Sequence, residues 1–140
     1  MVLQLLDGIN TLYVNHRDSI TITGAEFLWV FINDHTYKKY ACSPTETIVD
    51  DYRSSFEVTL TTNPIPLNGE VDMTLLGFYS VYIYEKTASE IATFDYSNID
   101  TADIRNIDGI VWQGKAQLTE SATTEDVYKD LRSSEDVYGN

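Results

Sequence analysis

The chain has 140 residues, 43% of them hydrophobic, and 22 acidic residues against 9 basic ones give a net charge of −13. This size and composition predict one globular domain that buries roughly two-thirds of its unfolded surface. The negative field repels nucleic acid and anionic membranes, so neither is expected as a direct partner. Cys42 is the only cysteine, which excludes an internal disulfide and favours assembly in a reducing compartment.

The first eight residues, Met-Val-Leu-Gln-Leu-Leu-Asp-Gly, contain a short apolar stretch with no basic residue before it. A secretory signal needs a basic start and a longer apolar region, and a membrane span needs about 20 apolar residues. The stretch therefore predicts a first strand.

Short apolar and β-branched runs between turn signals predict an all-β protein. The fold class predicted for residues 1–119 is an antiparallel β-sandwich, either Ig-like or jelly-roll-like. Residues 26–33 are apolar almost throughout, which favours a central strand covered on both faces, with a buried helix as the alternative. The predicted strands are 2–6, 10–14, 19–23, 26–33, 37–42, 54–62, 69–76, 78–86 and 109–119.

The clearest alternation runs from residue 68 to residue 86, with a break at Gly77. Such a run predicts either two adjacent antiparallel strands or one strand with a bulge. Tyr82 and Tyr84 are expected on the face opposite Val81 and Ile83, with Tyr79 close by. Exposed tyrosines can anchor a protein interface or stack on sugars, so these three are candidate interface residues.

Residues 87–108 form a long connection with a possible helical turn near residues 100–105. Its acidic and amide side chains supply the oxygen ligands that calcium prefers. Their spacing does not fit the EF-hand loop, so Asx turns are the favoured interpretation. The side chains concerned are Asp95, Asn98, Asp100, Asp103, Asn106 and Asp108.

The last segment, residues 120–140, is interpreted as an acidic C-terminal arm separate from the β domain. Thr-Glu-Asp-Val-Tyr at 124–128 returns as Ser-Glu-Asp-Val-Tyr at 134–138. Each copy could start a short helix, which would be marginal in isolation. We favour an arm that docks on a neighbour over a solvated tail. Its candidate contact residues are Val127, Tyr128, Leu131, Val137 and Tyr138.

Candidates for catalysis are few. His16, His35 and Cys42 are the residues that could act as base or nucleophile, and none lies in a recognisable catalytic pattern. Two histidines and one cysteine also cannot make a zinc site of three or four ligands at short spacing. We therefore expect no enzyme activity, no catalytic or metal-binding residue and no cofactor.

Six runs follow one another along the chain: Thr-Leu-Tyr-Val at 11–14, Glu-Phe-Leu-Trp-Val-Phe-Ile-Asn-Asp-His-Thr at 26–36, Asp-Tyr-Arg-Ser-Ser-Phe at 51–56, Leu-Asn-Gly-Glu at 67–70, Gly-Phe-Tyr-Ser-Val-Tyr-Ile-Tyr-Glu at 77–85 and Val-Trp-Gln-Gly-Lys-Ala at 111–116. In this order, residues 11–86 and the late strand near residue 111 resemble small virion structural proteins of tailed phages that infect Bacteroidetes-type hosts. These are strand and turn patterns without catalytic residues.

The resemblance implies a virion component that assembles in the host cytoplasm. Its expected partners are other virion proteins, such as the major capsid, connector or tail proteins, and further copies of itself in a homo-oligomer. Capsid decoration or cement, head–tail connector and tail subunit remain open as positions. The alternative function is an Ig-like glycan- or receptor-binding module that uses the tyrosine-rich face.

Overall fold

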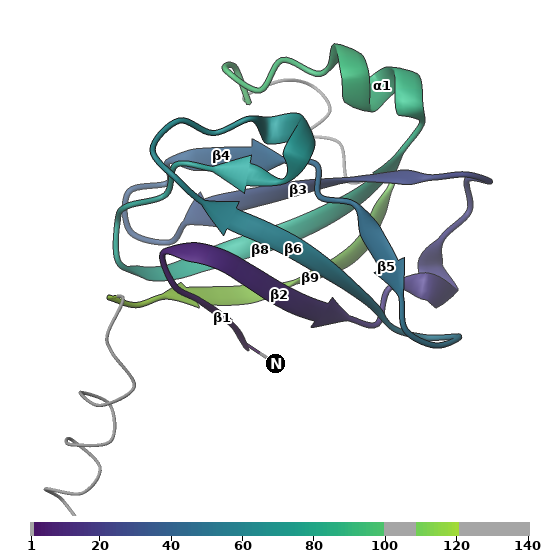
Figure 1. Cartoon of the computed structure of the whole chain (residues 1–140), viewed down its shortest axis with the longest axis horizontal. Coiled ribbons are helices and arrows are strands. Elements are labelled where there is room, and N and C mark those ends of the chain that lie inside the picture. Colours follow the sequence, from purple (N-terminus) through teal and green to yellow (C-terminus); the bar gives the residue numbers. More distant parts are fainter. Residues whose placement is uncertain (1, 100–108, 121–140) are drawn as a thin grey trace, which may run out of the picture.

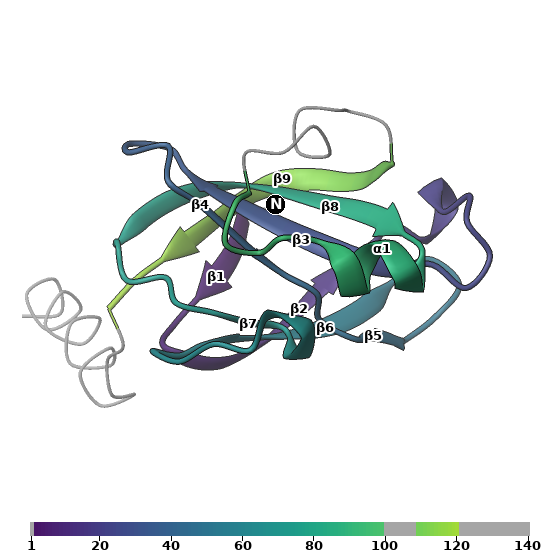
Figure 2. The same ribbon diagram turned by 90° about the horizontal axis from the view of Figure 1, so that it is seen from above.

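The computed structural model describes residues 2–99 and 109–120, which form two stacked β-sheets (Figures 1 and 2). The larger sheet has the strand order β1-β9-β8-β3-β4. The smaller sheet has the order β2-β6-β5, and β7 pairs with β6. The strands are β1 (Val2–Leu5), β2 (Gly8–Val14), β3 (Glu26–Asn33), β4 (Lys39–Cys42), β5 (Glu46–Ile48), β6 (Ser54–Leu60), β7 (Glu70–Val71), β8 (Gly77–Lys86) and β9 (Ile110–Leu118).

Both sheets are mixed, so the expectation of purely antiparallel pairing is wrong. β1 runs parallel to β9, with Val2 opposite Lys115, and β6 runs parallel to β7. The turn after β1 carries the chain into the other sheet, where β2 pairs with β6. β1 therefore forms no hairpin with β2 and instead adds to the free side of β9, where the Thr119 amide also donates to the Leu5 carbonyl (3.2 Å).

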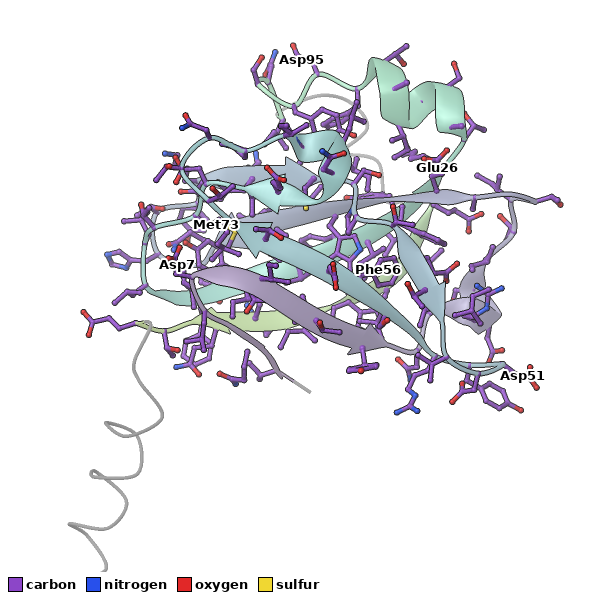
Figure 3. All side chains as sticks on the ribbon, viewed as in Figure 1. Asp7, Glu26, Asp51, Phe56, Met73 and Asp95 are labelled. Carbon is purple, nitrogen blue, oxygen red and sulfur yellow. The ribbon has the colours of Figure 1, made fainter. Side chains whose placement is uncertain are left out.

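The main core lies between the two sheets and follows the predicted alternation. Phe56, Val58 and Leu60 of β6 are buried, whereas Glu57 between them is exposed, which confirms the prediction for this strand. Phe56, labelled in Figure 3, packs against Trp29 of β3 with ring centroids 5.1 Å apart. Facing aromatic residues therefore fill the space between the sheets at its centre.

The central strand β3 is buried on both faces, as its apolar sequence predicted. Trp29 and Phe31 belong to the core between the sheets, whereas Leu28 and Val30 belong to a second cluster on the outer face. Helix α1 (Ala88–Thr93) covers that outer cluster with Ile91. The helix begins with a capping box in which Thr87 and Glu90 bond each other's backbone amides.

Several expected elements are corrected by the structure. Residues 19–23 are no strand, because the 3₁₀ turn η1 (Arg17–Ser19) and a bend occupy this region. Only residues 70–71 of the predicted strand 69–76 pair, after the 3₁₀ turn η2 (Pro66–Asn68). The break at Gly77 marks neither a hairpin turn nor a bulge. β7 and β8 lie in different sheets, and the chain crosses from one sheet to the other before β8 begins at Gly77. The helical turn expected near 100–105 lies outside the described residues, and α1 was not predicted.

Candidate interaction surfaces

Two of the three candidate interface tyrosines on β8 are buried inside the domain, so their expected exposure is wrong. Tyr79 is fully buried, and its hydroxyl donates to the Leu75 carbonyl (2.6 Å). Tyr79 is two residues before Val81 and four before Ile83, so all three side chains lie on the inner face of the sheet. Tyr84 does point to the outer face, as expected, but the cluster under α1 encloses it. Only Tyr82 is partly exposed.

The remaining candidate interface residues belong to the C-terminal arm. Val127, Tyr128, Leu131, Val137 and Tyr138 lie outside the described residues, and the prediction that they dock on a neighbour stays a prediction. The arm begins just after Thr119, at the end of β9 that lies beside β1.

A partly buried polar cluster joins η1, β5 and β6 around one carboxylate oxygen. Glu46 Oε2 lies 2.8 Å from His16 Nε2 and accepts hydrogen bonds from Arg17 Nη1 (2.8 Å) and Ser54 Oγ (2.7 Å). Partial burial raises the pKa of Glu46, but the bonds from Ser54 and Arg17 outweigh it and leave the pKa below its usual value. His16 is fully buried, with its ring edge-on to Phe27 at 4.9 Å.

The cluster ties the turn η1 to the smaller sheet. Arg17 and Ser54 donate to the same oxygen of Glu46 that His16 Nε2 contacts, so this carboxylate joins groups from η1, β5 and β6. Sequence reasoning considered His16 alone and missed the cluster. Glu46 is 30 residues away in the chain, and no local pattern joins the two.

A buried carboxylate anchors the loop before β3. Glu85 of β8 is 4% exposed, and its Oε1 accepts bonds from the Thr21 amide (2.9 Å), the Thr21 hydroxyl (2.8 Å) and the Ile22 amide (2.7 Å). The anchored loop forms one wall of a cleft of about 380 Å³, and Arg17 and Glu46 contribute to its lining. The loop is thus held in one position by a charge-assisted network.

The remaining chemical candidates from the sequence do not come together. Cys42 is fully buried on β4, and burial raises the pKa of its thiol far above the usual value, so the reactive thiolate is disfavoured. His35 is exposed in the turn between β3 and β4. Asp95 forms an Asx turn, with Oδ1 accepting from the Ser97 amide (3.0 Å). The Asx turns expected at 98–100 and 106–108 include residues outside the described part of the chain and stay predictions.

Residues 2–99 and 109–120 contain no group of three His, Cys, Asp or Glu side chains that could hold a metal ion. Among the same residues no helix combines the length and apolar character needed to cross a membrane. Asp100, Asp103, Asn106 and Asp108 lie outside this part of the chain.

An exposed ion pair links the turn after β3 to strands β8 and β9 of the larger sheet. Lys115 Nζ donates to Asp34 Oδ2 (2.7 Å) and to Ser80 Oγ (2.9 Å), and Ser80 Oγ donates to Asp34 Oδ1 (2.8 Å). The bond from Lys115 is the main reason that the pKa of Asp34 lies below its usual range.

The first exposed surface of interest is a groove between β2 and β9, which we call the β2–β9 groove. It has a volume of about 450 Å³. Tyr13 is half-exposed on one side, with the Arg53 guanidinium 5.8 Å from its ring centroid. On the other side the Trp112 indole lies over Gly114, where an added Cβ would come within 2.6 Å of the ring. The lining residues are Tyr13, Val14, Asn15, Arg53, Trp112, Gln113 and Gly114.

The second surface is an apolar patch around the start of β8, which we call the tip patch. Leu76 and Phe78 line one cleft together with Val2 of β1, and Leu75 precedes them in the chain. All four side chains are at least 40% exposed. Leu76 also lines a cleft of about 310 Å³ together with Leu118, Thr119 and Glu120. The tip patch therefore adjoins the point at which the chain enters the C-terminal arm.

Comparisons of this chain with protein-family models, with curated proteins and with solved structures find no match in any of the three.

Proposed function

We propose that the chain is a non-enzymatic structural subunit of a tailed-phage virion, either a capsid decoration or cement protein or a head–tail connector or tail subunit. The observation that carries this proposal is the tip patch beside the start of the arm. Large exposed apolar side chains that gather in one place on a small domain mark an interaction surface. Here they stand next to a segment of 20 further residues, counted from 121 to 140, that can add contact area.

The Ig-like form of the expected sandwich is the one that the topology supports. β3, β8 and β9 are neighbours in one sheet, as are strands C, F and G of an Ig domain, and β2, β6 and β5 match strands B, E and D. Trp29 occupies the place of the buried tryptophan on strand C. Tyr79 reproduces the tyrosine corner, because it lies near the start of β8 and its hydroxyl bonds the backbone four residues upstream.

In this Ig-like interpretation, apolar packing takes the place of the disulfide that joins the two sheets of an Ig domain. The second cysteine of an Ig domain lies two residues after the corner tyrosine, which is Val81 here. Val81 is fully buried in the core between the sheets. A domain stabilised in this way does not depend on an oxidising compartment, which supports assembly in the host cytoplasm.

A pull-down of virion proteins tests the function. Four forms are compared: the full-length chain, a chain ending at Glu120, the variant Leu76→Ser/Phe78→Ser, and the control Ile9→Ser. Ile9 is 72% exposed on β2 and lies outside the tip patch, so its replacement removes exposed apolar area elsewhere. We expect the full-length chain and the control to retain a virion protein, and the other two forms to lose it. Retention by none of the forms would refute the proposal.

The alternative, an Ig-like glycan- or receptor-binding module, is favoured by one observation. The β2–β9 groove places Tyr13 and Trp112 on opposite sides and the amides of Asn15 and Gln113 nearby, and such groups can stack on sugar rings and bond hydroxyls. A glycan array probed with the full-length chain and with Tyr13→Ser separates the two functions. Binding to a glycan that Tyr13→Ser abolishes would move this alternative to first place.

A further inference from the structure

We propose that the β2–β9 groove is the receptor for the C-terminal arm of a second copy of this chain, bound as an extended strand beside β9. The inference rests on the proposed function, in which the arm docks on a neighbour, and it names both the neighbour and the place. Residues 121–140 of one copy would thus fill the groove of the next.

The backbone of β9 offers a place for a short added strand. On one side β9 pairs with β8 along its whole length, but on the other side β1 pairs only with Lys115–Leu118. Among the described residues no strand pairs with β9 on that side at Gln113 and Gly114, which border the groove. The turn η1 also contacts β9, so an added strand shares β9 with this turn as well as with β1. Main-chain hydrogen bonds to such an edge supply affinity without requiring a particular sequence.

The side chains of the groove supply the specificity. Tyr13 and Trp112 present apolar surface, and the guanidinium of Arg53 lies at the rim beside Tyr13. Arg53 is paired with Asp50 at 3.4 Å, but both side chains are about half-exposed. Such an exposed pair contributes little, so a second carboxylate can replace Asp50 at small cost.

The arm carries the complementary pattern twice. In an extended strand, side chains two residues apart lie on the same face. In Thr-Glu-Asp-Val-Tyr at 124–128, Glu125 therefore shares a face with Val127, and Asp126 shares the other face with Tyr128. Either face offers one carboxylate for Arg53 and one apolar group for the groove. The repeat at 134–138 presents the same pairs.

The position of the arm favours a second copy over the chain's own groove. Thr119 still bonds Leu5, so the chain leaves β9 at the end covered by β1. To lie along Gln113 and Gly114 of its own β9, the arm would have to turn back past β1. An arm from a neighbouring molecule meets no such obstacle.

The test uses the full-length chain and a fluorescent peptide of residues 121–140. We expect the chain to self-associate with increasing concentration in sedimentation velocity, and the peptide to bind it and to compete with self-association. Tyr13→Ser and Arg53→Ser are each expected to weaken peptide binding at least fivefold, whereas Ile9→Ser leaves it unchanged. A peptide with Glu125, Asp126, Glu135 and Asp136 replaced by their amides is expected to bind more weakly and with less dependence on salt.

Three outcomes would overturn the proposal. The first is a chain that stays monomeric at every concentration. The second is a peptide that binds no better than a scrambled peptide of the same composition. The third is peptide binding that is equal in wild type, Tyr13→Ser and Arg53→Ser. A glycan that occupies the groove in place of the peptide would assign it to the alternative function. Virion proteins retained in the pull-down without peptide binding would leave the proposed function standing and refute this site alone.

Discussion

Replacing Glu85 by glutamine should destabilise the domain by about 2 kcal/mol, because three donors of the loop before β3 converge on one oxygen of this buried carboxylate. Hydrogen bonds to a charged group each contribute roughly 1.5–3 kcal/mol net. Glutamine keeps a carbonyl oxygen at Oε1 but loses the charge. It also turns an amide group toward the Thr21 amide, which Oε2 now contacts at 3.0 Å.

Urea unfolding followed by tryptophan fluorescence measures this effect, because Trp29 is fully buried in the folded state. A loss of about 2 kcal/mol should lower the urea concentration at the unfolding midpoint and leave the slope of the free energy against urea unchanged. In a separate thermal scan the same loss should lower the melting temperature by roughly 6–10 °C. Glu57→Gln is the matched control, since Glu57 is exposed on β6 and its change should cost less than about 0.5 kcal/mol. If both variants unfold at the same urea concentration, Glu85 does not anchor the loop and the reasoning is refuted.

Two further predictions concern Tyr79 and Glu46. Tyr79→Phe should destabilise the domain by about 1 kcal/mol, because the partly buried hydrogen bond to the Leu75 carbonyl is lost while the ring stays packed. A change below about 0.3 kcal/mol in urea unfolding would contradict the proposed tyrosine corner. The pKa of Glu46 is lower in the folded state than its usual 4.5, so its bonds stabilise the fold above that pH and lose this effect as the pH falls through the lowered value. The difference in unfolding free energy between wild type and Glu46→Gln should therefore shrink as the pH is lowered from neutral through the depressed pKa of Glu46, and a constant difference would contradict the role of the charge.

The sequence predicted those strands in which burial follows a simple pattern, either on alternate residues or on nearly all of them. β6 and β3 were placed correctly, because alternation and continuous apolar character report directly how many faces of a strand are covered. The same signal does not say which strand lies beside which. The parallel pairing of β1 with β9 joins residues more than 100 positions apart and leaves no local trace.

The candidate site was less predictable, because it depends on contacts between distant residues. Tyr79 could have been assigned to the core from its parity with Val81, but Tyr84 could not, since α1 covers it and was not foreseen. Trp112 and Tyr13 lie on strands of different sheets and meet only through the stacking of those sheets. The sequence therefore did not indicate which strands of the two sheets lie next to each other across the core.

The β2–β9 groove and the tip patch lie at different places along β9, and their separation limits the ways in which copies of the chain can assemble. If the arm that begins beside the tip patch fills the β2–β9 groove of a neighbour, the two partners contribute different surfaces to each contact. Such a contact is heterologous and repeats from copy to copy, so it closes into a ring when the rotation per subunit permits and otherwise extends into a filament. A two-fold symmetric dimer would need two such contacts, one for the arm of each copy. A closed ring would suit a connector or tail subunit, and particles of one discrete size in sedimentation would indicate it, whereas a continuous range of sizes would indicate an open chain.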